Sequence, residues 1–173
     1  MEALQKRQSQ RSYSNKDLSE QHHSNLLWAA YGMNRPKGYR TVPSAKSYHE
    51  FDIYIIKADG WYRYEPAGHF LIKMGDEDLR TIAGSQDFVQ TAPVNLIYVA
   101  DFERMTRDDD QNRIFYSACD VGFISQNVYL YCASEGLATV VRGQRDTDEL
   151  REALKLRPAQ HVILAQTLGY PEE

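Results

Sequence analysis

The longest apolar stretch of the chain, residues 113–137, reads RIFYSACDVGFISQNVYLYCASEGL. Apolar side chains fall on nearly every side of a helix drawn through it, which predicts a helix that its neighbours bury all round. Asp108, Asp109 and Asp110 precede the stretch, and acidic groups stabilise the N-terminal end of a helix. Gly136 is a suitable C-terminal stop. We expect the rest of the fold to form around this helix.

One side of the predicted helix carries mostly small residues, spaced three or four positions apart. They are Ala118, Gly122, Ser125 and Tyr129. Small side chains allow a second helix to approach closely. The stretch is therefore either a core helix within one chain or a core helix that also packs on its copy in a second subunit. Asp120, Gln126 and Asn127 make it too polar to span a membrane.

Length and composition are those of a single globular domain over residues 1–173. Hydrophobic residues make up 42% of the chain and charged residues 25%, so the chain can bury a sizeable core. The formal net charge of −4 argues against binding to nucleic acid or to an anionic membrane as the main function. Residues 1–25 contain no apolar segment of the signal-peptide kind.

The cysteines and histidines indicate neither a disulfide nor a metal site. Cys119 and Cys132 lie on the same predicted helix, roughly 20 Å apart at the helical rise, too far to bond to each other. Free thiols fit a reducing compartment, and we expect a cytoplasmic protein. The five histidines form no HExxH-type pattern. The glycine-rich phosphate loops of nucleotide-binding folds and the GxSxG elbow of serine hydrolases are also missing.

Strands dominate the remaining pattern. Ser19 is a good N-cap for a helix over residues 20–31, which Gly32 would close. Alternating or continuous apolar runs predict strands at 51–57, 61–65, 69–73, 94–100, 138–141 and 161–168. Further helices are expected at 77–90 and 147–156. This order predicts an α+β fold with a mostly antiparallel sheet and helices packed against it.

Two segments could bind a ligand. Arg7, Ser9 and Arg11 alternate, so in an extended segment they point the same way and form an anion receptor. The alternative is a solvated basic arm. The loop that contains Pro43, with small hydroxyl residues after it, suits close approach to a flat ligand, although ordinary loops have the same composition.

In combination these segments resemble the FMN-dependent nitroreductase family. Arg7-x-Ser9-x-Arg11-x-Tyr13 resembles the family's opening R-x-S-x-R-x-[FY] signature, and Pro43-Ser44-Ala45 resembles its second flavin segment. The resemblance covers almost the whole chain, because other features follow in family order. These are Ala92-Pro93 before a buried strand, the long helix ending Glu135-Gly136-Leu137, and Leu168-Gly169-Tyr170-Pro171. The short chain and the residues from Arg40 to Ala45 look closest to the branch that includes the peptide thiazole- and oxazole-forming dehydrogenases.

The resemblance implies an intertwined homodimer with FMN at the subunit interface and two equivalent sites. Arg7 would bind the FMN phosphate with Ser9 nearby, and Arg11 would stabilise the anionic reduced flavin at its pyrimidine edge. Gln86 would hydrogen-bond the pyrimidine ring. A partner subunit would contribute Pro43, Ser44, Ala45 and Ser47. Along the ring near N5, with a backbone N–H facing N5, would lie Val141, Arg142 and Gly143.

Two departures from the family pattern affect this implied site. Ser47 stands where the family's second segment usually has asparagine, so one flavin contact is expected to be shorter or lost. Many relatives continue past the last strand with Lys or Arg that complete the phosphate clamp, whereas this sequence ends at Pro171-Glu172-Glu173. Arg7 is therefore expected to bind the phosphate with fewer neighbouring cations. Arg40 is expected to substitute for the missing ones.

The implied activity is that of an FMN-dependent oxidoreductase. It would pass hydride from NADH or NADPH through flavin N5, in a ping-pong cycle, to a nitroaromatic, quinone or similar small acceptor. No side chain would be catalytic, and Arg11 would give electrostatic support. One alternative is an FMN-dependent dehydrogenase that oxidises a peptide azoline or another small substrate. Others are a non-catalytic flavin-binding or storage protein and a degenerate fold without flavin that acts as a binding module.

Overall fold

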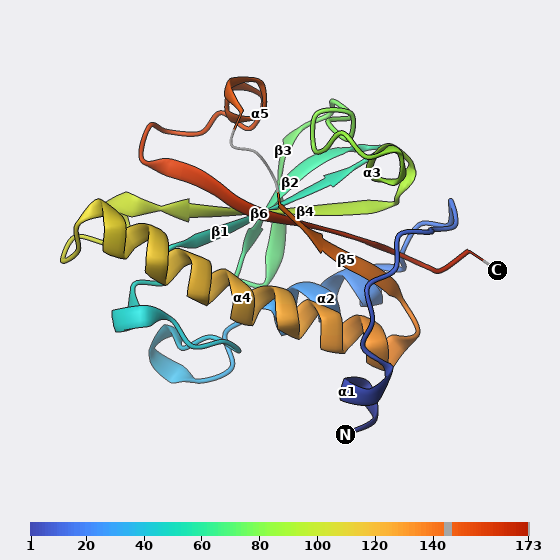
Figure 1. The fold of residues 1–173 in the computed structure, drawn as a ribbon, viewed down its shortest axis with the longest axis horizontal. Helices are drawn as coiled ribbons and strands as arrows, with labels where there is room; N and C mark the ends of the chain where they lie inside the picture. The colour runs from blue at the N-terminus through green and yellow to red at the C-terminus, as the bar shows by residue number, and fades with distance from the viewer. Residues whose placement is uncertain (144–146, 173) are drawn as a thin grey trace.

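Six strands form one sheet, and helices lie against both of its faces in this computed structural model, which describes residues 1–143 and 147–172 (Figure 1). The strands are β1 (Phe51–Lys57), β2 (Gly60–Glu65), β3 (Phe70–Gly75), β4 (Val94–Asp101), β5 (Ala138–Arg142) and β6 (Gln160–Gly169). Their spatial order is β3-β2-β1-β4-β6-β5, and each neighbouring pair is antiparallel. The predicted α+β class and antiparallel sheet are confirmed.

The helices divide between the two faces of the sheet. They are α1 (Glu2–Lys6), α2 (Glu20–Tyr31), α3 (Asp87–Thr91), α4 (Asp110–Glu135) and α5 (Asp148–Ala153), with single 3-10 turns η1 (Pro36–Gly38), η2 (Ala45–Ser47) and η3 (Phe102–Arg104). In Figure 1, α2 and α4 lie on one side of the sheet, and α3 and α5 lie on the other. Each side therefore has its own hydrophobic core.

Strand β4 is buried on both of its faces, which explains why its apolar residues do not alternate with polar ones. Leu96 and Tyr98 pack into the core under α2 and α4. Ile97 and Val99, which point the opposite way along a strand, pack into the core under α3 and α5. A central strand covered on both faces is mostly apolar on both sides, as β4 is from Leu96 to Ala100.

Helix α4 begins at Asp110, slightly earlier than the predicted stretch that starts at Arg113, and Gly136 ends it as the sequence predicts. The Asp109 carboxylate caps its first turn by accepting from the Asn112 N–H, and Gly136 ends it in the left-handed conformation at φ 70°. Among residues 1–143 and 147–172, α4 included, no helix is long and apolar enough to cross a membrane.

Within one chain, however, the prediction that neighbours bury this helix all round is wrong. Ile114 and Phe115 are each 60% exposed, and Phe123 is 46% exposed. The small-residue stripe also winds around the helix, so that Ala118 and Gly122 face outward while Ser125 and Tyr129 are buried. We call the outward side, made of Ile114, Phe115, Ala118, Gly122 and Phe123, the apolar face of α4.

The helix expected over residues 77–90 does not form. Residues 76–86 are turns, and α3 has only five residues. Gly84 falls in the middle of the expected helix, and glycine disfavours helix by about 1 kcal/mol. The Ala83 carbonyl, which a helix would need, instead accepts from the Arg142 side chain. The other predicted strands and helices are present, with small shifts at their ends.

The N-terminal arm, residues 7–14, runs along the β5 edge of the sheet. The Gln10 N–H donates to the Thr139 carbonyl at 2.9 Å, and Tyr13 pairs with Pro171 across an isolated bridge. The short helix α1 before the arm was not predicted, and it packs on α4. These contacts bring the arm, β5 and the C-terminal half of α4 together (Figure 1).

Candidate functional site

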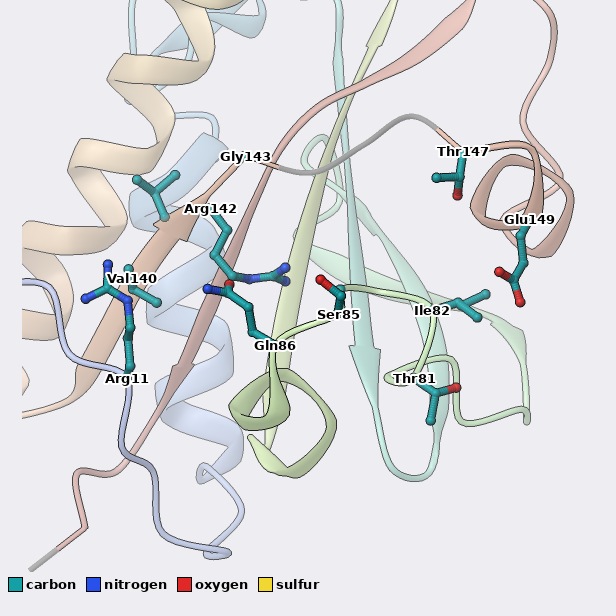
Figure 2. Close-up of a pocket in the computed structure, with 12 residues that line it drawn as sticks. Arg11, Thr81, Ile82, Ser85, Gln86, Val140, Arg142, Gly143, Thr147 and Glu149 are labelled. Atoms are coloured by element: carbon teal, nitrogen blue, oxygen red, sulfur yellow. The ribbon is translucent and has the colours of Figure 1, made fainter.

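A cavity of about 630 Å³ opens beside the end of β5 (Figure 2). Its walls come from the N-terminal arm, the turn before α3, the end of β5 and the start of α5. The predicted site residues that line it are Arg11, Gln86, Val141, Arg142 and Gly143. Cavities of this size commonly hold small molecules or cofactors. The structure therefore brings together residues that are far apart in the sequence and that the resemblance assigned to one site.

Hydrogen bonds to buried groups fix Arg142 beneath this cavity. Its guanidinium donates to Thr167 Oγ1 at 2.9 Å, to the Ala83 carbonyl at 3.1 Å and to Asn95 Oδ1 at 3.3 Å. Burial lowers the pKa of Arg142 to about 10, so the side chain remains cationic at neutral pH. A fixed positive charge makes this end of the cavity suited to an electron-rich ligand edge.

Asn95 and Thr167 hold Arg142 in place, and sequence reasoning missed both. Thr167 Oγ1 donates to Asn95 Oδ1 at 2.7 Å, and Asn95 Nδ2 donates to the Val89 carbonyl at 2.9 Å. Both residues are fully buried. A polar side chain inside an otherwise apolar central strand must find a buried partner. That was the signal available in the sequence.

Arg7, Ser9 and Val141 meet at one residue, Tyr129 of α4. Tyr129 Oη lies 2.9 Å from Ser9 Oγ and accepts from the Val141 N–H at 2.9 Å. The Arg7 guanidinium carbon lies 5.2 Å from the centre of the Tyr129 ring. The Val141 N–H is therefore already bonded within the protein. Arg11, farther along the arm, lines the cavity and does not join this cluster.

The loop that carries Pro43, Ser44, Ala45 and Ser47 lies elsewhere in the chain. The Ala45 N–H donates to Asp120 Oδ2 on α4 at 2.8 Å. Asp120 and Tyr129 are nine residues apart on α4, which is about 13 Å along the helix axis. Within one chain, these predicted flavin contacts are not beside the cavity.

Residues 44–49 hold an unusual backbone. Lys46, Ser47 and His49 have φ values of 50°, 56° and 49°, in the left-handed region that side chains other than glycine rarely adopt. Ser44 Oγ accepts from the His49 N–H at 2.9 Å and donates to Glu50 Oε2 at 3.4 Å. Such a conformation persists only where surrounding contacts enforce it. The loop is therefore held in one shape by Ser44, Glu50 and Asp120.

Arg40 comes just before this loop in the chain and packs on Tyr31 at the end of α2. Its guanidinium carbon lies 5.0 Å from the centre of the Tyr31 ring. Its Nε and Nη1 atoms are buried and have no hydrogen-bond partner in the described part of the chain. Buried guanidinium donors normally bind an acceptor, so Arg40 has donors available for a group that is not part of this chain.

Two buried carboxyl groups support the loop. Glu50 is fully buried and Asp120 is almost so. Burial raises the pKa of Glu50 to about 7, with a further contribution from the neighbouring Asp120 charge. Burial likewise raises the pKa of Asp120. Both groups therefore hold a proton more tightly in the folded protein than in the unfolded chain.

We expect the free energy of unfolding to fall as the pH rises from about 4.5 to 7. In the unfolded chain Glu50 loses its proton near its ordinary value of 4.5, whereas the folded protein retains it to about 7. The folded state binds more protons across this window, so raising the pH destabilises it, by about 3 kcal/mol for Glu50. Urea unfolding at pH 5 and pH 8 measures the difference.

Glu50→Gln should remove most of this pH dependence, because an amide does not ionise. The matched control is Glu152→Gln, which changes an exposed carboxylate on α5 and should leave the pH dependence as it is. If Glu50→Gln shows the same decline with pH as the parent, Glu50 ionises normally in the folded state.

Metal chemistry has no support at this site. In the described part of the chain, no three His, Cys, Asp or Glu side chains are grouped so that they could bind a metal ion. Cys132 is buried on α4, and burial raises the pKa of its thiol to about 12, so it packs as a small apolar residue. The polar side chains that line the cavity are instead those of Arg11, Thr81, Ser85, Gln86, Arg142, Thr147 and Glu149.

Comparison with known proteins gives one consistent result. Residues 4–170 match the sequence model of the nitroreductase family. A provisionally named nitroreductase of Methanocaldococcus jannaschii is 37% identical over 178 residues, which cover 97% of this chain and 89% of that protein. A crystal structure from Ralstonia eutropha JMP134, also provisionally named a nitroreductase, has a TM-score of 0.92 and 40% identity over 99% of this chain and 82% of that one.

A third relative shares the fold at lower identity. It is the NADPH:FMN oxidoreductase of Vibrio harveyi, solved in complex with NAD⁺. Its TM-score is 0.74 at 19% identity, with 99% of this chain and 68% of that chain covered.

Proposed function

Because the chain belongs to the nitroreductase family and is therefore an oxidoreductase, we propose that it binds FMN and uses NADH or NADPH to reduce a small-molecule acceptor such as a nitroaromatic or a quinone. The observation that carries the proposal is the cavity at the end of β5, where Arg11, Gln86 and Arg142 come together from three separate segments. The family match and the NADPH:FMN oxidoreductase neighbour support a flavin and a nicotinamide as the cofactors.

The residues of the cavity fit FMN. A volume of about 630 Å³ is in the range of cofactor sites. Among residues 1–143 and 147–172, apart from its own neighbours in the chain, no atom lies within 4 Å of the position that a Cβ would take at Gly143, so these residues leave room for a flat ring at the backbone there. Arg11 and Gln86 would hydrogen-bond the polar edge of the ring, and Arg142 keeps a positive charge beneath the cavity. Arg7 and Ser9 would bind the phosphate.

Bound FMN would supply the hydride-transfer chemistry, and the chain would supply binding, orientation and charge. The proposed reaction therefore needs no side chain that acts as a nucleophile. Arg11 would favour electron density at the ring edge, because a cation stabilises the negative charge that develops there on reduction.

A second copy of the chain would complete the site. The loop with Pro43, Ser44, Ala45 and Ser47 lies about 13 Å along α4 from Tyr129, so in one chain it cannot contact the same flavin ring closely. The apolar face of α4 is exposed in the single chain and offers a surface for the twofold-related helix. We propose that the loop, and Arg40 with its free donors, serve the cavity of the other subunit.

The visible absorption spectrum of the purified protein tests this function. We expect flavin bands that bleach when NADH or NADPH is added under argon and return when a quinone is added. Bands that neither donor bleaches would favour a flavin-storage protein or a dehydrogenase whose own substrate is the donor. A protein that stays colourless after incubation with FMN would contradict the proposed function and leave the fold assignment intact.

A further inference from the structure

We propose that Tyr129 is the positioning residue of a phosphomonoester site whose binding groups are Arg7 and Ser9. The inference rests on the proposed function, because the phosphomonoester is that of FMN. Tyr129 would not contact the phosphate itself. It would act by fixing the donor directions of the two residues that do.

The first support is the convergence of three segments on one side chain. Tyr129 lies on α4, Ser9 on the N-terminal arm and Val141 on β5. The phenol oxygen is 2.9 Å from Ser9 Oγ and 2.9 Å from the Val141 nitrogen. Tyr129 is only 6% exposed, so α4 holds the phenol in a fixed place, and the arm is bonded to a rigid point.

The second support is the direction of the hydrogen bonds. The Val141 N–H can only donate, so it takes a lone pair of the phenol oxygen. We therefore assign the phenol hydrogen to Ser9 Oγ. Ser9 then accepts from Tyr129 and keeps its own hydroxyl hydrogen for an outside acceptor. A chain of donors that runs from Val141 through Tyr129 to Ser9 strengthens the last donor in the series.

The third support is the placement of Arg7. Its guanidinium lies over the Tyr129 ring, with 5.2 Å between the guanidinium carbon and the ring centre. A guanidinium stacked on an aromatic face leaves its N–H edge free for a planar or tetrahedral anion. One tyrosine thus orients both an arginine and a hydroxyl donor, the combination that binds phosphate well.

Tyr129 also connects the phosphate end of the site to the cavity. The Val141 N–H donates a hydrogen bond to Tyr129, and Val141 lines the cavity beside Arg142. The two ends of the proposed site are therefore fixed relative to each other by a single phenol. A ligand with a phosphate at one end and a ring at the other would gain from this arrangement.

The test compares FMN with riboflavin, which has the same ring and no phosphate. Dissociation constants for both are measured by flavin fluorescence on apoprotein of the parent, Tyr129→Phe, Ser9→Ala and the double variant. We expect Tyr129→Phe to bind FMN about tenfold more weakly, the size of a lost hydrogen bond to a charged group, and to bind riboflavin as the parent does. The double variant should be no weaker than Ser9→Ala, because Tyr129 would act through Ser9.

Tyr131→Phe is the matched control. Tyr131 is also on α4, but its hydroxyl lies 2.9 Å from His22 Nδ1, away from the arm residues of the site. It should bind both flavins like the parent. Ser9 lies on an exposed arm, so Ser9→Ala should fold normally. It tests the same site even if Tyr129→Phe folds poorly.

Each other outcome overturns the inference. Equal weakening of FMN and riboflavin in Tyr129→Phe would mean that the phenol only supports the fold. Unchanged FMN binding would mean that Ser9 needs no orientation by the phenol hydroxyl. Additive losses in the double variant would mean that Tyr129 and Ser9 act separately. A parent that binds neither flavin would overturn the proposed function together with the inference.

Discussion

Gly122→Leu should give a well-folded monomer that has lost its FMN. Apart from the backbone of α4 itself, no atom of residues 1–143 and 147–172 lies within 4 Å of the position that a Cβ would take at Gly122. Leucine is also the better helix former by roughly 0.8 kcal/mol, so the protomer itself should not be destabilised. The larger side chain would clash only where a second helix approaches the apolar face of α4, and there it would force the two helices apart.

Loss of the dimer should remove FMN as well, because the site would then lack the loop with Pro43 and Ser44 from the second subunit. Size-exclusion chromatography with light scattering gives the mass, and the flavin absorbance per protein gives the occupancy. Glu135→Leu places the same bulk on an exposed position of α4 outside the apolar face, and it should stay dimeric and yellow. A yellow Gly122→Leu monomer would contradict the shared site, and a normal dimer would show that Gly122 is not at the contact.

Arg11→Ala should lower the rate at which NADH bleaches the flavin by about a hundredfold, the usual cost of removing a positioned charge or donor from a reaction site. Arg11 lines the cavity from the exposed N-terminal arm, so its loss should change neither the fold nor the dimer. Arg11→Lys should fall between the parent and Arg11→Ala, because lysine keeps the charge but loses the planar donor edge.

Stopped-flow absorbance under argon measures this rate. Arg35→Ala is the matched control. Arg35 is an exposed arginine whose guanidinium lies 5.3 Å from the Tyr39 ring centre, and it does not line the cavity. An Arg11→Ala protein that is reduced as fast as the parent would place Arg11 away from the reacting edge.

The elements that the sequence predicted well are those with strong local signals. Helix α4 has an acidic N-terminus, an uninterrupted apolar pattern and Gly136 at its end, and all three act within a few residues. Strand β4 is apolar from Leu96 to Ala100 because both of its faces are covered. The helix expected at 77–90 failed because a long-range contact, from Arg142 to the Ala83 carbonyl, competes with the local preference.

The candidate site was only partly predictable, for a related reason. Gln86, Arg142 and Arg11 could be assigned to one site by resemblance, and the fold places them around one cavity. Tyr129 was interpreted as part of a helix contact, because its bonds to Ser9 and Val141 depend on how the arm and β5 meet α4. No spacing in the sequence encodes that meeting point. The left-handed residues of the 44–49 loop were equally hidden, since Lys46 and Ser47 carry no glycine-like signal.

Helix α4 holds the 44–49 loop through Asp120 and the N-terminal arm through Tyr129, so in the proposed dimer each helix would serve two different sites. Two damaged chains could then repair each other. A subunit with a defective Asp120 still has a sound Tyr129, and a subunit with a defective Tyr129 still has a sound loop. Co-expression of the two variants should give mixed dimers in which one site is intact and the other carries both defects. Two inactive alleles would complement each other, which is a genetic signature of a site divided between subunits.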